Sequence, residues 1–164
     1  MLPNDLKRFF QPIVGVVLVL ALATVSPENA KAEQVDLEIV LAVDASGSIN
    51  RAEYALQMKG YADAFREPSI HTAIRSGPHG KVAVALMLWS DAAFPKHATE
   101  WYVLSTPRSA ENFARVLETF QGHSGRDRGI GGGGTGIGDG VRYASEMLRK
   151  NAFEGVRKVI DVSG

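Results

Sequence analysis

The chain has 164 residues, of which 45% are apolar and 22% charged, a composition that excludes a disordered chain and predicts one globular domain. Its 18 basic and 18 acidic residues balance, so the charge indicates neither a nucleic-acid partner nor an anionic membrane surface. The absence of cysteine excludes disulfides and cysteine-ligated zinc or iron–sulfur centres.

The N-terminus has the three parts of a secretory signal. The basic pair Lys7-Arg8 precedes the uncharged apolar run Ile13–Thr24, and Ala30-Lys31-Ala32 supplies the small residues that signal peptidase reads. An uncleaved membrane anchor is the alternative, but the run is shorter than the ~20 residues of a span. We therefore expect residues 1–32 to be a signal peptide and 33–164 to be an exported domain, periplasmic or secreted.

The first expected elements are a strand and a helix. Residues 35–43 alternate and then become continuously apolar, which is typical of a strand entering a sheet covered on both faces. Asn50 and Glu53 form a capping-box pattern. Apolar residues at helical spacing then predict an amphipathic helix over 51–66, which Pro68 ends.

Two strands and a helix are expected next. Residues 81–90 are a second buried strand, and the shorter 99–104 follows closely enough to pair with it antiparallel. Thr106-Pro107 is a typical helix start. The expected buried stripe of that helix is Phe113, Val116, Leu117 and Phe120.

The last third holds a glycine-rich loop over 121–134, a helix and a strand. The helix carries a stripe of Ile137, Val141, Ala144 and Leu148. Residues 156–162 form the fourth strand. Strands that alternate with helices predict an α/β fold, a Rossmann-like, doubly wound and mostly parallel sheet of about four strands.

Asp44, Ser46 and Ser48 directly follow the first strand. Ligands bind at the carboxyl ends of strands in open α/β sheets, and one carboxylate with two hydroxyls offers the hard oxygen ligands that Mg²⁺, Mn²⁺ or Ca²⁺ prefer. The alternative is that both serines only cap the following helix. The pattern alone does not decide between a metal loop and a cap.

A second motif favours the metal site. Thr135 follows four glycines, which allow close backbone approach, and it opens a helix where its hydroxyl can cap or face a ligand. We expect Asp139, in the first turn of that helix, to have a structural role. Asp91 and the four histidines are expected on the surface or in loops. Trp89 and Trp101 are expected in the core rather than in a ligand platform.

Together, Asp44-Ala45-Ser46-Gly47-Ser48 and the later Gly-Gly-Thr-Gly-Ile-Gly-Asp-Gly resemble the von Willebrand factor A domain over nearly all of residues 33–164. The sequence around Asp44 and the segment Val159–Gly164 resemble those of a bacterial branch of this family whose function is unassigned. The resemblance implies a metal-ion-dependent adhesion site built from Asp44, Ser46, Ser48 and Thr135.

The family completes this site with a further Asp in the loop after the next strand, which we expect just after Gly164. Asp161 is not expected to replace it, because Asp161 lies within the strand, several residues short of that loop. Residues 33–164 therefore resemble a partial domain, truncated at the C-terminus. In it, the strand over 156–162 is expected to be an uncovered edge, which is prone to aggregation.

The resemblance implies an exported protein-binding module that depends on a divalent cation, Mg²⁺ or Mn²⁺ with Ca²⁺ as a further candidate, and that binds an acidic side chain of an unknown protein partner. One alternative is a metal-assisted hydrolase; Gly131-x-Gly133-x-x-Gly136 fits a dinucleotide pattern, but it follows no strand. The other alternative is a truncated remnant without binding activity. The sequence identifies neither the partner nor the process.

Overall fold

A computed structural model describes residues 31–92, 96–120 and 136–164 of the chain. The described residues all belong to one compact unit, Lys31–Gly164. The predicted signal peptide over 1–32 lies almost wholly outside the described residues, as does the glycine-rich loop. No helix among the described residues is long and apolar enough to cross a membrane.

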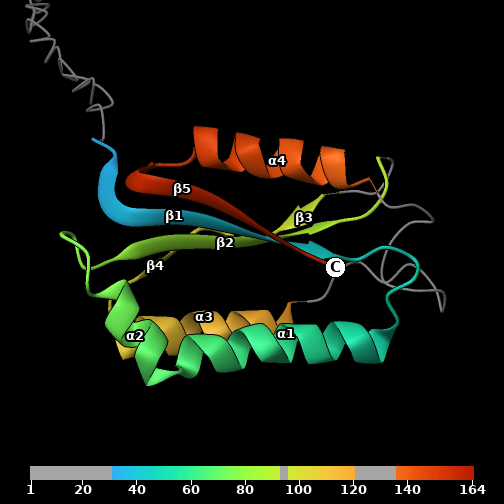
Figure 1. Ribbon diagram of the computed structural model, residues 1–164, viewed down its shortest axis with the longest axis horizontal. Helices are drawn as coiled ribbons and strands as arrows, with labels where there is room; N and C mark the ends of the chain where they lie inside the picture. The colour runs from blue at the N-terminus through green and yellow to red at the C-terminus, as the bar shows by residue number, and fades with distance from the viewer. Residues whose placement is uncertain (1–30, 93–95, 121–135) are drawn as a thin grey trace, which may run out of the picture. The chain divides into compact units, whose positions relative to one another are not determined.

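Strands and helices follow one another in groups along the chain, with short strands in the middle (Figure 1). In chain order they are β1 (Glu33–Asp44), α1 (Arg51–Arg66), α2 (Pro68–Ile74), β2 (Val82–Trp89), β3 (His97–Ala98), β4 (Tyr102–Leu104), α3 (Pro107–Thr119), α4 (Ile137–Lys150) and β5 (Phe153–Ser163).

The sheet is mostly parallel, as predicted. Its order is β3-β2-β1-β5, with β4 also pairing with β2. β1 lies parallel to β2 and to β5, whereas β3 and β4 run antiparallel to β2. The structure describes five strands rather than about four. β4 lies within the segment predicted as one strand over 99–104, and β3 lies just before that segment, where no strand was predicted. The Rossmann-like α/β fold class is confirmed.

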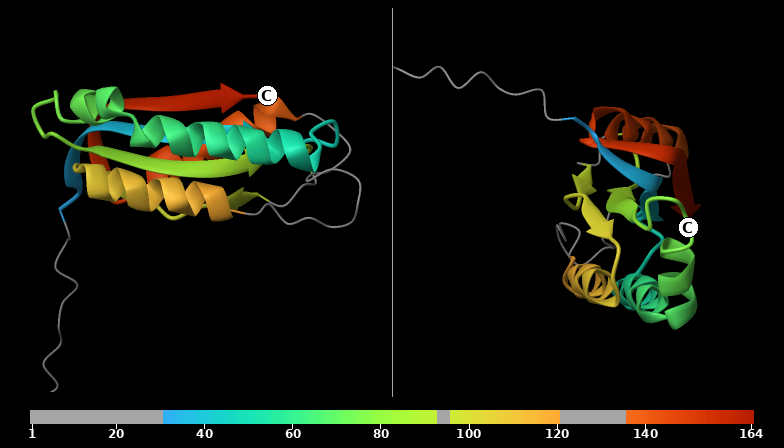
Figure 2. Two further views of the ribbon diagram at one scale, coloured as in Figure 1. Left: turned by 90° about the horizontal axis from the view of Figure 1, so that it is seen from below. Right: turned by 90° about the vertical axis from the view of Figure 1, so that its left-hand side faces the viewer.

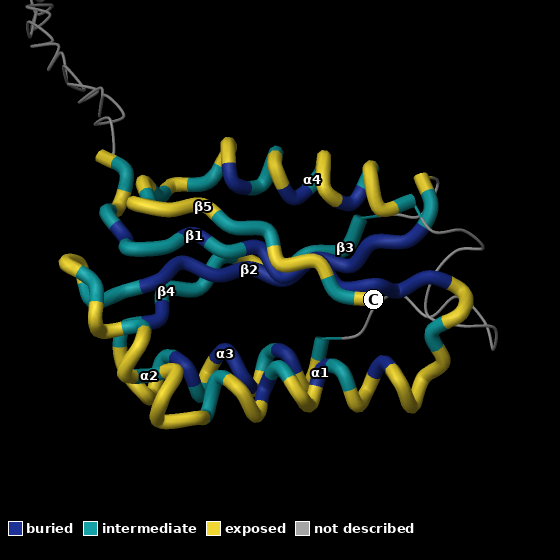
Figure 3. The backbone as a smooth tube through the Cα atoms, viewed as in Figure 1, coloured by how far each residue is buried: buried dark blue, intermediate teal, exposed yellow. Residues whose placement is uncertain are grey.

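Helices cover both faces of the sheet. α1, α2 and α3 lie on one face and α4 on the other, and α1 runs beside α3 (Figures 1 and 2). One core lies between the sheet and α1 and α3, with Phe113 and Leu86 fully buried. A second core joins Trp89 on β2 to Ala144 and Leu148 on α4. β2 is buried along its whole length, whereas β5 is largely exposed (Figure 3).

The start of α1 is confirmed in detail. Asn50 Oδ1 accepts the backbone N–H groups of Ala52 and Glu53, at 2.9 and 3.0 Å, and Glu53 Oε2 accepts that of Asn50 at 2.9 Å. The end of α1 differs from the prediction in one respect. Pro68 ends α1, as predicted, but it also opens α2, because proline is well suited to the first turn of a helix.

An ion-pair network ties α1 to α3. Arg66 at the end of α1 donates to Glu111 at 2.8 Å and to Glu118 at 2.6 Å. These hydrogen bonds lower the pKa of both carboxyls. The two helices are therefore held together by charge as well as by their apolar faces.

The predicted stripe of α4 is only half right. Ala144 and Leu148 are buried, but Ile137 is 53% exposed and Val141 is 37% exposed. The reason is Gly140, where a side-chain carbon would lie 2.8 Å from Trp89 Cβ. This close approach turns the face of Gly140, Ala144 and Leu148 toward the sheet and leaves Ile137 and Val141 outside.

A buried charge holds the start of β5 against β1. The side chain of Glu38 is fully buried and accepts hydrogen bonds from the Gly155 N–H at 2.6 Å and from Asn151 Nδ2 at 2.7 Å, while Lys158 Nζ lies 3.0 Å away. A buried carboxylate is tolerated only when it is paired in this way. Sequence reasoning missed this cluster.

Candidate functional site

The candidate loop leaves the sheet at the carboxyl end of β1. Asp44 is the last residue of β1, pairs in register with Trp89 on β2, and is only 7% exposed. The Ala45 N–H donates to the Trp89 carbonyl at 2.8 Å, which extends the pairing by one residue. The sheet therefore fixes the position of Asp44 before the chain turns away.

The loop brings together the oxygen atoms that the sequence singled out. Asp44 Oδ1 accepts the Ser46 N–H at 2.6 Å, and the Oγ atoms of Ser46 and Ser48 lie 3.1 Å apart. Ser46 is buried and Ser48 is exposed. One carboxylate and two hydroxyls thus lie in a single turn that opens to solvent at Ser48.

Neither serine caps α1. That role belongs to Asn50, whose side chain accepts both backbone N–H groups that a cap must satisfy. The alternative in which Ser46 and Ser48 only cap the helix is therefore wrong. Their hydroxyls hydrogen-bond to each other instead.

The carboxyl end of β5 lies beside the same loop. Ser163 pairs with Val43, and a side-chain carbon on Gly164 would lie only 2.9 Å from Asp44 Oδ2. The backbone of Gly164 therefore lies directly beside the Asp44 carboxylate.

The start of α4 reaches this edge from the other side. The Gly136 N–H donates to the carbonyl of Ser90, directly after β2, at 2.7 Å. A side-chain carbon at Gly136 would lie 2.9 Å from that carbonyl oxygen. Thr135, the residue before Gly136, lies outside the described residues, so its place in the site stays a prediction.

The other acids near this edge have structural partners. Asp139, in the first turn of α4, accepts a hydrogen bond from Arg142 at 2.7 Å, which with the nearby charge of Lys96 lowers the pKa of that carboxyl. Asp161 pairs in register with Leu41, three residues before Asp44, which places it about 10 Å short of the edge. Asp161 is therefore not a substitute for the expected further Asp.

A side-chain cluster missed by sequence reasoning ties α1 to the end of β5. Tyr61 OH lies 3.3 Å from Asp161 Oδ2 and 2.9 Å from Ser163 Oγ, and Gln57 Nε2 donates to Ser163 Oγ at 2.9 Å. Burial and the charge of Asp161 raise the pKa of Tyr61. The spacing of Gln57 and Tyr61, four residues apart on one helix face, is a signal that would have indicated a shared contact.

Across the described residues, no group of three or more His, Asp or Glu side chains lies close enough together to hold a metal ion. A cation at this edge would therefore depend on hydroxyl oxygens together with Asp44. The donor set fits a hard ion: for ligands at right angles and 2.0–2.1 Å from Mg²⁺, the oxygen–oxygen spacing is about 3 Å, close to the 3.1 Å between Ser46 Oγ and Ser48 Oγ.

Comparisons with known proteins add a family and one similar structure. The family described as "Protein of unknown function (DUF1194)" matches residues 34–164. No curated protein matches. The crystal structure of the pilus adhesin SpaC from Lactobacillus rhamnosus GG is similar at a TM-score of 0.46 and 21% identity; the match covers 79% of this chain but only 16% of the adhesin.

Proposed function

Since the chain belongs to the DUF1194 family, whose description assigns no activity, we propose a function from the site itself: a protein-binding module that depends on a divalent cation. The observation that carries the proposal is the Asp44-Ser46-Ser48 turn. At the carboxyl edge of the sheet the Asp44 carboxylate accepts the Ser46 backbone N–H, the two serine hydroxyls lie 3.1 Å apart, and neither hydroxyl is used to cap α1.

The chemistry of the turn favours Mg²⁺ or Mn²⁺, with Ca²⁺ as a further candidate. Carboxylate and hydroxyl oxygens are hard ligands, and no softer ligand is available from cysteine. In this proposal Asp44, Ser46 and Ser48 hold the ion, and Thr135 adds a hydroxyl from the loop before α4.

A site with few carboxylates leaves a bound cation with uncompensated positive charge. We propose that an acidic side chain of a protein partner binds there, at the side where Ser48 is exposed. An exported location, as the predicted signal peptide implies, belongs to the same proposal.

Thermal melts with and without Mg²⁺ or Mn²⁺ test the proposal, because an ion that binds only the folded chain raises the melting temperature. At a hundredfold excess over Kd we expect a rise of about 10 °C. Asp44→Asn should abolish the rise. Asp63→Asn, which alters an exposed acid on α1, should leave it intact.

The same preparations separate binding from catalysis. Phosphoesterase substrates added with Mg²⁺ should show no turnover above background. Sustained turnover that Asp44→Ala abolishes would replace the binding proposal with a metal-assisted hydrolase. A melt that is not cooperative, or that no cation shifts, would favour the remnant alternative.

A further inference from the structure

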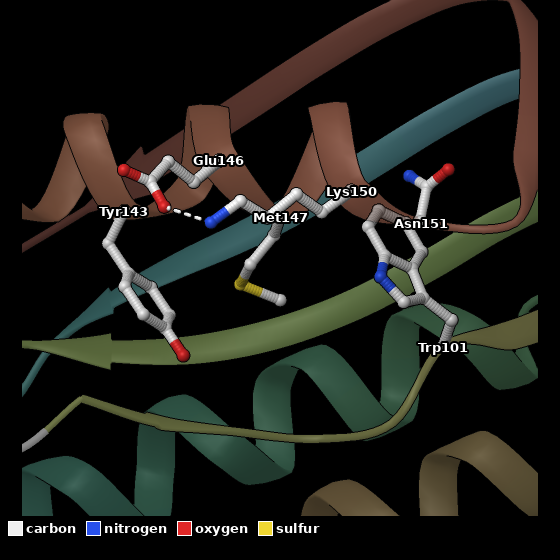
Figure 4. Close-up of a pocket in the computed structure, with 6 residues that line it drawn as sticks. All are labelled: Trp101, Tyr143, Glu146, Met147, Lys150 and Asn151. Carbon is white, nitrogen blue, oxygen red and sulfur yellow. Dashed lines mark hydrogen bonds and ion pairs between the residues drawn. The ribbon is translucent and has the colours of Figure 1, made fainter.

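A pocket of about 310 Å³ lies between α4 and the segment before β4, in a part of the unit that the cation proposal does not use. Trp101 lines it from that segment, and Tyr143 and Met147 line it from α4 (Figure 4). Met147 lies between the two aromatic rings, so the floor is apolar and the sides are aromatic.

The pocket is built rather than accidental. The Trp101 ring packs on the ring of Phe153, the first residue of β5, with centroids 5.9 Å apart. Asn151, at the end of α4, is held by bonds to Glu38 at 2.7 Å and from the Phe153 N–H at 2.9 Å. The Trp101 side of the pocket is therefore held by β5, and the Asn151 side by the buried Glu38.

The charges at the rim cancel. Glu146 and Lys150 form an ion pair at 2.9 Å along α4, which the dashed line in Figure 4 marks. This pair lowers the pKa of the Glu146 carboxyl, so the carboxylate stays ionised and matched at neutral pH. The rim therefore carries no net charge to attract a charged ligand, and an uncharged ligand is complementary to it.

Two polar groups at the pocket can donate to a ligand. Neither the Trp101 indole N–H, which only donates, nor the Tyr143 O–H, which can also accept, hydrogen-bonds to any residue within the described ranges. Asn151 already uses both ends of its amide. A matching ligand therefore presents carbonyl acceptors and apolar rings.

We propose that this pocket binds a proline-rich segment of a partner protein in the polyproline II conformation. Proline has no N–H, and the polyproline II backbone leaves every carbonyl free to accept a hydrogen bond. Aromatic-lined grooves recognise such segments. At 310 Å³ the pocket is at the small end for an organic ligand, but it accommodates two proline rings of a peptide that crosses the surface.

Calorimetric titration of the full chain with a capped hexaproline peptide tests the proposal. We expect saturable binding to hexaproline and none to a capped Gly-Ser peptide of the same length. Excess EDTA and the Asp44→Asn variant should leave the binding unchanged, because the pocket lies on the second half of α4 and the proposed cation site lies before its first turn. The result is therefore independent of the proposed function.

Two conservative variants test the donors without removing the rings. Trp101→Phe and Tyr143→Phe should each weaken binding about three- to tenfold, the effect of one lost hydrogen bond. Tyr102→Phe is the matched control: its ring packs on Phe113 in the other core, so binding should be unchanged. Equal affinity for the Gly-Ser peptide, no saturable heat with hexaproline, or binding that neither variant weakens would overturn the proposal.

Discussion

The hydroxyl oxygens of Ser46 and Ser48 lie 3.1 Å apart in a turn whose helix is capped by a different residue, Asn50. The sequence places all three residues within one segment before α1, so a serine or the asparagine could have capped the helix. In the structure the roles are divided. Asn50 stabilises the helix, and the serines lie with Asp44 at the carboxyl edge of the sheet.

This division predicts opposite effects for two substitutions. Asn50→Ala should lower the free energy of unfolding by about 1 kcal/mol, the usual effect of a lost N-cap. It should leave unchanged the Mn²⁺ concentration at which half of the protein is bound. Ser48→Ala should change the stability of the cation-free protein little, because Ser48 is exposed. It should raise the Mn²⁺ concentration at which half of the protein is bound. Urea unfolding and Mn²⁺ titration of both variants measure the two effects. If Ser48→Ala lowered the free energy of unfolding as much as a lost N-cap does, the separate roles of Asn50 and the serines would be contradicted.

Glu38 offers a test of the buried cluster. Glu38→Ala should lower the free energy of unfolding by about 3 kcal/mol, because it removes the buried acceptor for the part-buried donors of Gly155 and Asn151. Glu38→Gln keeps an acceptor and should cost less. Urea unfolding measures the difference between the two variants. Equal losses of unfolding free energy would contradict a stabilising role for these hydrogen bonds.

Asp36 predicts an acid-dependent loss of stability. Burial raises the pKa of this carboxyl, but the backbone N–H groups of His79 and Lys81 donate to it, at 2.9 and 3.1 Å, and the net effect lowers the pKa below its usual value. A lowered folded-state pKa stabilises the protein above the unfolded pKa, and this contribution is lost as the pH falls through the folded value.

The wild-type urea midpoint should therefore exceed that of Asp36→Asn at pH 6, and the gap should close as the pH falls below about 4. Urea titrations at several pH values measure it. A gap that stays constant down to pH 2.5 would mean that the carboxylate charge plays no part in holding the turn at Gly80.

Much of this fold followed from local patterns. The range of α1 and its cap were predicted from Asn50, Glu53 and the apolar spacing, because both signals act within one turn. Val141 was predicted to be buried but is exposed. The sequence pattern could not show this, since the orientation of α4 depends on the contact between Gly140 and Trp89 across two elements. Glu38 was missed for the same reason: its partners lie more than 110 residues away in the chain.

The candidate site was predictable in part. Asp44, Ser46 and Ser48 are adjacent in sequence and directly follow a strand, so the strand rule places them at the edge. Tyr61 and Ser163 meet only because β5 returns beside β1, which no local pattern states. Trp101, expected in the core, is only half-buried and lines a pocket, because the strand predicted over 99–104 begins only at Tyr102.

The most direct test of the cation site is calorimetric titration of Mn²⁺ into the full chain and into the Asp44→Asn variant, with a circular dichroism spectrum to confirm that the variant is folded. The proposed site predicts one saturable Mn²⁺ per wild-type chain and none on folded Asp44→Asn, since this carboxylate is the one charged ligand in the turn. Equal Mn²⁺ binding by both proteins, or no binding by the wild type, would contradict a cation site at Asp44.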